Sequence, residues 1–186
     1  VSAALDEALA AHGRIDVLVN NAGYGQFGPI VEMSLDSLRA QLETNVIGAL
    51  RVAQAVAPHM MDRRQGLIVN VGSVSGIITT PFAGAYCASK AALHAISDAL
   101  RLELQPFGVR VVTLQPGAVC TSFSATGGAS LAGFDWETSR YRPIRQAIED
   151  RTRTAENSKV DADTFARQTV DVLLRDDPPV VDRRGT

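Results

Sequence analysis

The chain has 186 residues, of which 46% are hydrophobic, so it is long and apolar enough to form one domain with a sizeable core. Its formal net charge of −2, without a charge run or a low-complexity tract, argues against a nucleic-acid-binding protein. No apolar run approaches the roughly 18 residues that would suggest a membrane span.

Strand-like apolar runs alternate with amphipathic helical patterns along the chain. The strand-like runs are apolar at consecutive positions, which is typical of parallel strands that helices cover on both faces. This alternation predicts right-handed crossovers and an α/β fold with a doubly wound parallel sheet. The expected helices cover residues 1–12, 36–61, 84–103, 141–153 and 161–175, and the expected strands cover 15–19, 67–71, 108–114 and a last one from about 178.

Polar or glycine-rich segments follow the first three expected strands, at 20–25, 72–76 and 115–121. Ligands of open parallel sheets bind beyond the carboxyl ends of the strands. We therefore expect these three segments to line one crevice. From residue 118 to 159 the pattern loosens, and Gly127-Gly128 is expected to mark a loop.

Tyr86 and Lys90 stand four residues apart in the helix expected over 84–103, in a chain with 16 Arg and only two Lys. Four residues is about one helical turn, so the phenol and the ammonium share a face. A free phenol titrates near ~10, and a fixed ammonium beside it lowers that pKa, which suits proton transfer. The alternative is an ordinary amphipathic helix with a buried tyrosine and a snorkelling lysine.

Five motifs in order resemble the short-chain dehydrogenase/reductase family. They are Asn-Asn-Ala-Gly at 20–23, Asn45, Ser73, the pair Tyr86 and Lys90, and Pro-Gly-Ala-Val-Cys-Thr at 116–121. The resemblance implies a Rossmann-like sheet and hydride exchange between a nicotinamide cofactor and a carbonyl or alcohol substrate. It treats residues 1–186 as a single partial domain, with the core and catalytic motifs in 1–121, a substrate lid in 122–160, and a terminal helix and strand in 161–186.

The resemblance also implies roles for the catalytic residues. Tyr86 would exchange the proton on the substrate oxygen, with Lys90 lowering its pKa and holding the cofactor ribose, while Ser73 would donate to the developing alkoxide. Asn45 would carry a water-mediated proton relay through Lys90. A loop serine that bonds its own backbone and a solvent-facing asparagine are the alternatives for Ser73 and Asn45.

Cofactor contacts follow from the same resemblance. Thr121 would bond the nicotinamide carboxamide, with a helix N-cap as its alternative role, and Gly23 would let backbone approach the cofactor. The residues implied to contact the cofactor are Asn20, Ala22, Gly23, Tyr86, Lys90, Pro116, Gly117, Val119 and Thr121.

Two features of the family are missing from the chain: the glycine-rich turn that cradles the pyrophosphate, and the strands that precede residue 1. We therefore expect a fragment of a longer enzyme, or a truncated gene product, in which the sheet lacks its first strands. The strand at 15–19 would then be an exposed apolar edge.

Trp136, Tyr141 and Phe134 fall in the expected lid and would either line an apolar pocket or close the core. The segments at 141–144 and 161–167 are similar to the fungal acyl-dihydroxyacetone-phosphate reductase branch. That similarity implies a lipid-like or otherwise apolar carbonyl substrate and favours NADP(H) over NAD(H).

Cys87 and Cys120 are isolated, so we expect packing roles, no metal site and a reducing, cytoplasmic location. His12, His59 and His94 lie on expected helices without paired ligands, and we assign them no chemistry.

Two functions remain open from the sequence. The first is an NAD(P)-dependent oxidoreductase acting on a small carbonyl or alcohol. We expect such an enzyme to form a homo-oligomer through the helices at 36–61 and 84–103. The second is a truncated family member that works without nicotinamide, as an isomerase, a cyclase or a non-catalytic binding protein.

Overall fold

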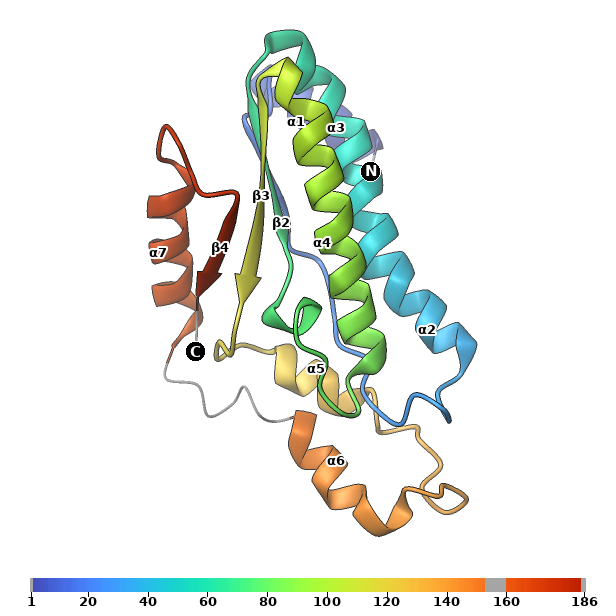
Figure 1. The fold of residues 1–186 in the computed structure, drawn as a ribbon. Coiled ribbons are helices and arrows are strands. Elements are labelled where there is room, and N and C mark those ends of the chain that lie inside the picture. The colour runs from blue at the N-terminus through green and yellow to red at the C-terminus, as the bar shows by residue number, and fades with distance from the viewer. Residues whose placement is uncertain (1, 153–159, 185–186) are drawn as a thin grey trace.

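The computed structural model describes residues 2–152 and 160–184. Within these residues the chain forms a parallel sheet with helices on its two faces, which confirms the expected α/β class (Figure 1). Strand order in the sheet follows strand order in the chain, so each connection runs over the sheet and returns to a neighbouring position. The strands are β1 (Val17–Asn20), β2 (Gly66–Val71), β3 (Val109–Pro116) and β4 (Val181–Arg184).

The helices match the amphipathic patterns, with caps that fix where they begin. The Ser34 hydroxyl accepts a hydrogen bond from the Ser37 backbone N–H (3.1 Å), and the Asp161 carboxylate accepts one from the Thr164 N–H (2.9 Å). The described helical segments are α1 (Ser2–His12), α2 (Leu35–Leu42), η1 (Glu43–Gly48), α3 (Ala49–Arg63), η2 (Val74–Gly76), α4 (Gly84–Leu104), η3 (Gln105–Phe107), α5 (Phe123–Ala129), η4 (Arg142–Ile144), α6 (Arg145–Thr152) and α7 (Ala162–Leu173).

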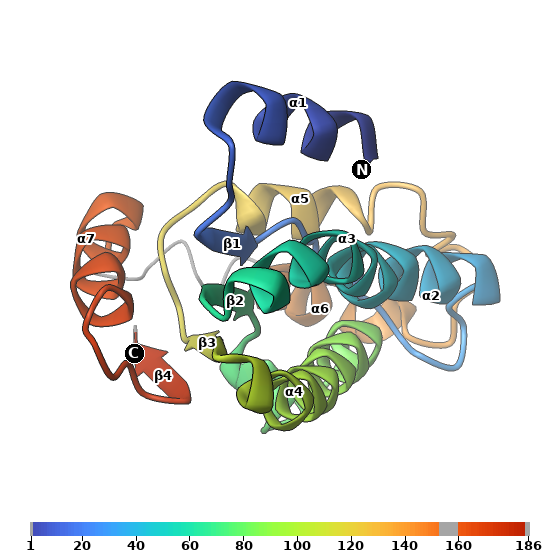
Figure 2. The ribbon, with the colours of Figure 1, turned by 90° about the horizontal axis from the view of Figure 1, so that it is seen from above.

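The core has one layer on each face of the sheet. Figure 2 places α3 and α4 on one side of the strands and α7 on the other. Met60 of α3 packs with Ile68 and Val111 on the first side, while Leu173 of α7 packs with Val69 and Val112 on the second. Helices on both faces explain why β2 and β3 are apolar at nearly every position.

Strand β1 is the edge of the sheet among the described residues. Val17 is 40% exposed and Val19 is 53% exposed, whereas Leu67 and Val69, their partners on β2, are buried. The expected apolar edge is therefore present.

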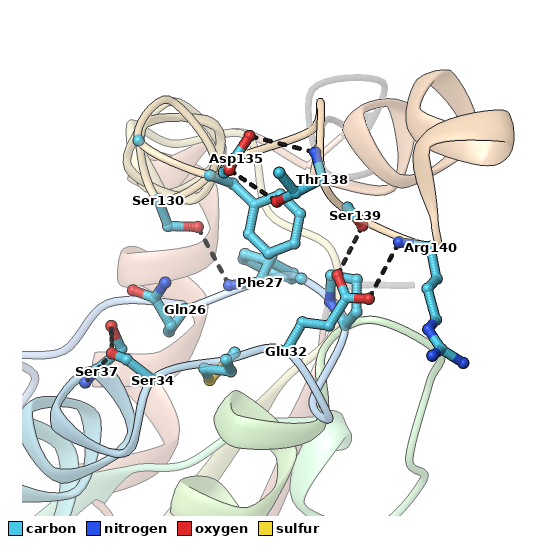
Figure 3. A pocket seen from close by; sticks show the side chains of 15 residues that line it. Gln26, Phe27, Glu32, Ser34, Ser37, Ser130, Asp135, Thr138, Ser139 and Arg140 are labelled. Carbon is cyan, nitrogen blue, oxygen red and sulfur yellow. Dashed lines mark hydrogen bonds between the residues drawn. The ribbon is translucent and has the colours of Figure 1, made fainter.

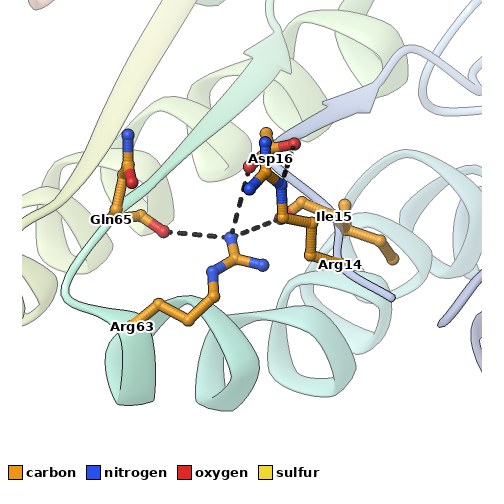
Figure 4. Close-up of polar contacts among 5 residues, drawn as sticks. All are labelled: Arg14, Ile15, Asp16, Arg63 and Gln65. Atoms are coloured by element: carbon orange, nitrogen blue, oxygen red, sulfur yellow. Dashed lines mark hydrogen bonds and ion pairs between the residues drawn. The ribbon is translucent and has the colours of Figure 1, made fainter. Parts of the chain in front are cut away.

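The residues just before β1 are held by polar contacts at the last turn of α3 (Figure 4). The Arg63 guanidinium donates to the backbone carbonyls of Ile15 (2.8 Å) and Gln65 (3.2 Å), and Arg14 pairs with the Asp16 carboxylate at 3.1 Å. These contacts fix the start of β1, and hence the position at which its carboxyl end delivers Asn20.

Three local predictions were wrong. The long helix is not regular, because the π-helical turn η1 interrupts it between α2 and α3. The expected loop at Gly127-Gly128 lies inside α5, where Gly127 is needed since a Cβ there would come within 2.7 Å of the Phe27 ring. Ile144, inside the helix expected over 141–153, lies instead in the 3₁₀ segment η4 and is 46% exposed.

None of the helices in residues 2–152 and 160–184 is both long and apolar enough to cross a membrane.

Candidate active site

A cavity of about 780 Å³ opens beyond the carboxyl ends of β1, β2 and β3. The three segments predicted to share a crevice all contribute to it: Gly23 from the first, Ser73 from the second, and Gly117 from the third. Tyr86 and Lys90 of α4 also line it. The parallel topology brings these residues together because parallel strands end at the same edge of the sheet.

Tyr86 sits in an aromatic wall of this cavity. Its ring lies 5.3 Å from that of Phe123 and 6.1 Å from that of Phe27, measured between centroids. Burial raises the pKa of the Tyr86 phenol above its usual range, and a side-chain hydrogen bond with Ser73 offsets part of that rise. The hydroxyl groups of Ser73 and Tyr86 therefore lie next to one another in the cavity.

The sequence-based prediction that Lys90 lowers the pKa of Tyr86 was wrong for the protein alone. The Lys90 ammonium lies 5.8 Å from the Tyr86 ring centroid and donates to the Val71 carbonyl at 2.7 Å. Burial lowers the pKa of Lys90 itself to about 8. Desolvation dominates at both groups, because each is withdrawn from water into the same apolar wall.

Asn45 is buried, only 1% exposed, which excludes the solvent-facing alternative. Its amide donates to the Tyr24 carbonyl (2.9 Å) and to the Ser89 hydroxyl (3.0 Å), and its oxygen accepts from the Tyr24 N–H (3.1 Å). A Cβ at Gly23 would lie 3.1 Å from that oxygen. Asn45 thus shapes the loop that carries Gly23, and the π-helical turn η1 turns its side chain inward.

Asn20 does not line the cavity but supports it from below. Its amide donates to the Ala49 carbonyl (3.2 Å) and to the Asn70 side-chain oxygen (2.8 Å). Asn70 in turn donates to the Ser97 hydroxyl at 2.8 Å. Sequence reasoning missed Asn70 and Ser97; an asparagine inside an otherwise apolar strand was the available signal.

His94, to which we assigned no chemistry, holds the loop that carries Ser73. Its Nε2 accepts from the Ser73 backbone N–H at 3.3 Å, and its ring fills the space beside Gly72 and Gly76. Burial, followed by the charge of Lys90, lowers the pKa of His94, which keeps the ring neutral and able to accept. The Ser73 hydroxyl also accepts from the Ser75 N–H (3.1 Å), which is the backbone bond considered in the loop-serine alternative.

The segment after β3 forms the third side of the cavity. Pro116, Gly117, Val119 and Thr121 all line it, and the Gly117 N–H donates to the Arg184 carbonyl of β4 at 2.7 Å. The Thr121 hydroxyl accepts from the Phe123 N–H (3.2 Å) at the start of α5, but the N-cap of that helix is Ser122, so Thr121 is not the N-cap considered for it. Ala22, expected at the crevice floor, is exposed and does not line the cavity.

The lid aromatics close a small core of their own. Trp136 is buried with Leu131 and Ile148, and Phe134 and Tyr141 pack around them. A second cavity of about 680 Å³ lies between this segment and the loop after β1 (Figure 3). Across it, the Glu32 carboxylate accepts from the Ser139 hydroxyl (2.6 Å) and the Arg140 N–H (3.2 Å), which ties the lid to that loop.

Among the described residues, no group of three or more His, Cys, Asp or Glu side chains is arranged to hold a metal ion. Cys87 is buried, Cys120 is exposed, and both are free thiols. The polar groups that line the larger cavity include the Tyr86 phenol, the Ser73 hydroxyl and the Lys90 ammonium group.

In open parallel α/β sheets ligands bind beyond the carboxyl ends of the strands, which is where this cavity lies. The family model described as short chain dehydrogenase matches residues 1–131. The chain belongs to this family, which confirms the resemblance read from its motifs.

Individual relatives agree with this assignment. The chain is 38% identical over 124 residues to a 3-ketodihydrosphingosine reductase of Bacteroides thetaiotaomicron, a match to 67% of this chain and 46% of that protein. The chain spans about half the length of the curated relatives it matches. The match covers 55% of an uncharacterized oxidoreductase of Schizosaccharomyces pombe and 46% of the reductase above.

Two solved structures show the same fold. A short chain dehydrogenase/reductase from Burkholderia phymatum in complex with NAD superimposes with a TM-score of 0.82 at 27% identity, over 96% of this chain and 65% of that one. A gluconate 5-dehydrogenase from Burkholderia cenocepacia in complex with NADP and tartrate gives 0.63 at 35% identity, over 66% and 48%. Members of the family with either cofactor are thus similar to this chain.

Proposed function

We propose that the chain carries the catalytic centre of an NAD(P)-dependent oxidoreductase that reduces a carbonyl group or oxidises an alcohol. The observation that carries this proposal is the placement of Ser73, Tyr86 and Lys90 around one cavity at the strand ends. Similarity to reductases and dehydrogenases supports it, since two of the similar structures hold a nicotinamide dinucleotide.

In the reduction direction Tyr86 is the proton donor. Its raised pKa keeps the phenol protonated at neutral pH, so it is ready to donate to the substrate oxygen as negative charge develops there. Ser73 donates a second hydrogen bond to the same oxygen, which stabilises the alkoxide. A bound reduced nicotinamide supplies the hydride that the carbonyl carbon receives.

The residues present fit such a cofactor. Gly23 leaves its side of the cavity open, since a Cβ there would come within 3.6 Å of the Lys90 ammonium as well as close to Asn45. Lys90 would hold the ribose, and Thr121 the carboxamide, with Pro116, Gly117 and Val119 beside the ring. Once a cofactor is bound beside Lys90, we expect the ammonium group to lower the pKa of Tyr86, as the sequence predicted.

Asn45 acts, in this proposal, on Lys90 through the loop that carries Gly23.

The lid and the aromatic wall favour an apolar or lipid-like substrate, because most lining residues of the cavity are apolar, Val74, Ile78, Phe123 and Phe165 among them. The cofactor is NAD(H) or NADP(H), and we propose to test NADP(H) first.

Calorimetry of the purified protein with NADPH and with NADH tests this function. We expect micromolar binding of at least one of them, and oxidation of that cofactor in the presence of an apolar ketone or aldehyde. The contrary outcome has two parts: calorimetry shows that the cofactor binds no more tightly than free adenosine, and the ketone causes no oxidation of NADPH or NADH. That outcome would favour a role without nicotinamide.

We also propose that copies of the chain associate through α2, α3 and α4. Ile47 between α2 and α3 and Leu102 of α4 are large apolar side chains that are 44% and 59% exposed. Sedimentation of the wild-type protein against a variant with Ile47→Lys and Leu102→Lys tests this; an unchanged sedimentation coefficient would exclude the contact.

A further inference from the structure

Three side chains on one face of α4 contact the segment at the end of β2. Tyr86, Lys90 and His94 are spaced by four residues, so they follow one another along the same side of the helix. The Lys90 ammonium donates to the Val71 carbonyl at 2.7 Å. Tyr86 forms a hydrogen bond with the Ser73 side chain, and Nε2 of His94 accepts from the Ser73 N–H at 3.3 Å. Two residues of this face thus act on the same serine.

The His94 ring fits closely against the segment that carries Ser73. A Cβ at Gly72 would overlap with Nε2, and a Cβ at Gly76 would come within 2.5 Å of Cε1. Glycine at these two positions therefore leaves room for the ring where it lies. The Gly72 N–H donates to the Leu114 carbonyl of β3 at 2.7 Å, so the backbone around the serine is fixed from the sheet on one side and from α4 on the other.

The direction of the Ser73 hydroxyl depends on this backbone. Ser73 is extended (φ −172°, ψ 154°) and caps the short helical turn η2, with its oxygen accepting from the Ser75 N–H at 3.1 Å. A serine hydroxyl has one proton to donate, and here that proton has to face Tyr86 and the substrate oxygen. A side chain that fixes the Ser73 N–H therefore also fixes the donor.

His94 can accept this hydrogen bond only while its ring is neutral. Nε2 accepts through its lone pair, so Nδ1 carries the ring proton, and a second proton would occupy Nε2 and set it against the Ser73 N–H. Burial lowers the pKa of His94, as do the charges of Lys90 on α4 and Arg183 on β4, whereas Asp98 of α4 raises it. The accepting form is therefore the one present at neutral pH.

We propose that His94 is a positioning residue of the reaction: its neutral ring holds the Ser73 backbone so that the serine hydroxyl faces Tyr86 and the substrate oxygen, and protonation of the ring releases this hold. The role rests on the proposed function, because there Ser73 donates to that oxygen. His94 does not line the cavity itself, so it acts through the serine alone. The reaction should slow as pH falls through the pKa of His94, which lies below the usual value of about 6.5.

Nuclear magnetic resonance of isotope-labelled protein tests the contact without turnover. Between about pH 5 and 8, the ring nitrogens of His94 report where the ring takes up its second proton, and the Ser73 amide should shift at the same midpoint. In His94→Gln the side-chain oxygen can accept from the same N–H without titrating, so this shift should disappear. His59→Gln makes the same change at an exposed position of α3 and should keep the wild-type behaviour.

The rate of ketone-dependent cofactor oxidation tests the positioning role. For the wild-type protein and His59→Gln, kcat should fall about ten-fold or more toward acid pH, with the midpoint measured for the His94 ring and little change in KM for the cofactor. His94→Gln should lack this fall. His94→Leu fills the space without an acceptor, so at every pH it should have the low rate that the wild-type protein reaches in acid. Circular dichroism at the lowest pH checks that each protein is folded.

Two results overturn the role of His94. One is a Ser73 amide that does not follow the titration of the ring, and the other is an acid fall in kcat that His94→Gln shows as fully as the wild-type protein. Failure of the function itself looks different. In that event no variant oxidises NADPH or NADH at any pH, while the Ser73 amide still follows His94, which supports the contact and overturns only its use in this reaction.

Discussion

The part of the molecule beneath the catalytic cavity and the part that covers it are built differently. Beneath it, the floor formed by β1, β2 and α4 is joined by buried polar side chains, with Asn70 bonded to both Asn20 and Ser97. The segment expected to be the lid, described over 122–152, is joined by aromatic packing, such as the Phe134 and Trp136 rings 4.6 Å apart. Several polar contacts of the lid are exposed, including the Arg142–Glu137 ion pair.

The difference shows which region fixes the positions of the site residues and which region only closes a core over the cavity. Directional hydrogen bonds among buried groups allow one arrangement and penalise any other, so the floor fixes where Tyr86, Ser73 and Lys90 lie. Aromatic and apolar contacts are less directional, so the lid can change its residues while keeping a closed core. We therefore expect substitutions in the floor to cost catalysis or stability strongly, and substitutions in the lid to cost little.

The largest effect is expected for Tyr86→Phe, which removes the proton donor and keeps the ring. Ketone-dependent oxidation of the reduced cofactor should fall about 10²- to 10⁴-fold. Cofactor binding should persist. Tyr141→Phe, which removes a hydroxyl from the lid, is the control and should retain activity; a Tyr86→Phe variant as active as that control would remove Tyr86 from the mechanism.

A second effect concerns Lys90 and pH. Its folded pKa of about 8 lies below the unfolded value, so the penalty for burying its charge is fully present below pH 8 and is relieved as pH rises toward ~10.4. The free energy of unfolding should therefore rise by up to about 3 kcal/mol over that window relative to Lys90→Met. Tyr86 works in the opposite sense above pH ~10, because its raised folded pKa gives stability that is lost there.

Denaturant titrations of wild type and Lys90→Met at intervals between pH 7 and pH 10 measure this difference. Parallel stability profiles for the two proteins would show that Lys90 does not titrate with a lowered pKa.

A third and smaller effect tests the floor directly. Asn70→Ala leaves Ser97 and the Asn20 amide without their partner in a buried site, so the free energy of unfolding should fall by about 2 kcal/mol. Asn21→Ala removes an asparagine at an exposed position and should change stability by less than about 0.5 kcal/mol. Equal losses in the two variants would contradict the account of a polar floor.

The smallest effect is expected in the lid. Glu32→Gln removes the charge from the carboxylate that bonds Ser139 and Arg140 but leaves an acceptor oxygen in place. Because the site is partly exposed, the loss of stability should be about 1 kcal/mol or less. A loss as large as that of Asn70→Ala, in the same denaturant titration, would mean that the lid is as tightly determined as the floor.

Much of the site was predictable because its signals are local. Tyr86 and Lys90 are one helical turn apart, and the segments that hold Gly23, Ser73 and Gly117 each follow an apolar strand. Parallel topology then brings the segments together without any long-range information. The caps Ser34 and Asp161 are local in the same sense, because each accepts from a backbone N–H three residues further along the chain.

The rest depended on contacts between distant parts of the chain. Asn70 meets Ser97, and Arg151 meets Thr80, across 27 and 71 positions of sequence, so neither pair has a local pattern. The direction of the pKa shift of Tyr86 depended on burial, which overrode the ammonium one turn away. In the same way, packing against Phe27 placed Gly127 in a helix where its propensity predicts a loop.

The most direct test of the account follows a label through a single turnover. A reduced nicotinamide cofactor that carries deuterium at the transferable position is mixed with the protein and an apolar ketone, and the alcohol is examined by mass spectrometry and NMR. Hydride transfer with Tyr86 as proton donor predicts one deuterium on the carbinol carbon, formed by wild type and almost absent with Tyr86→Phe. An alcohol without deuterium, or equal labelled product from the variant, would contradict it.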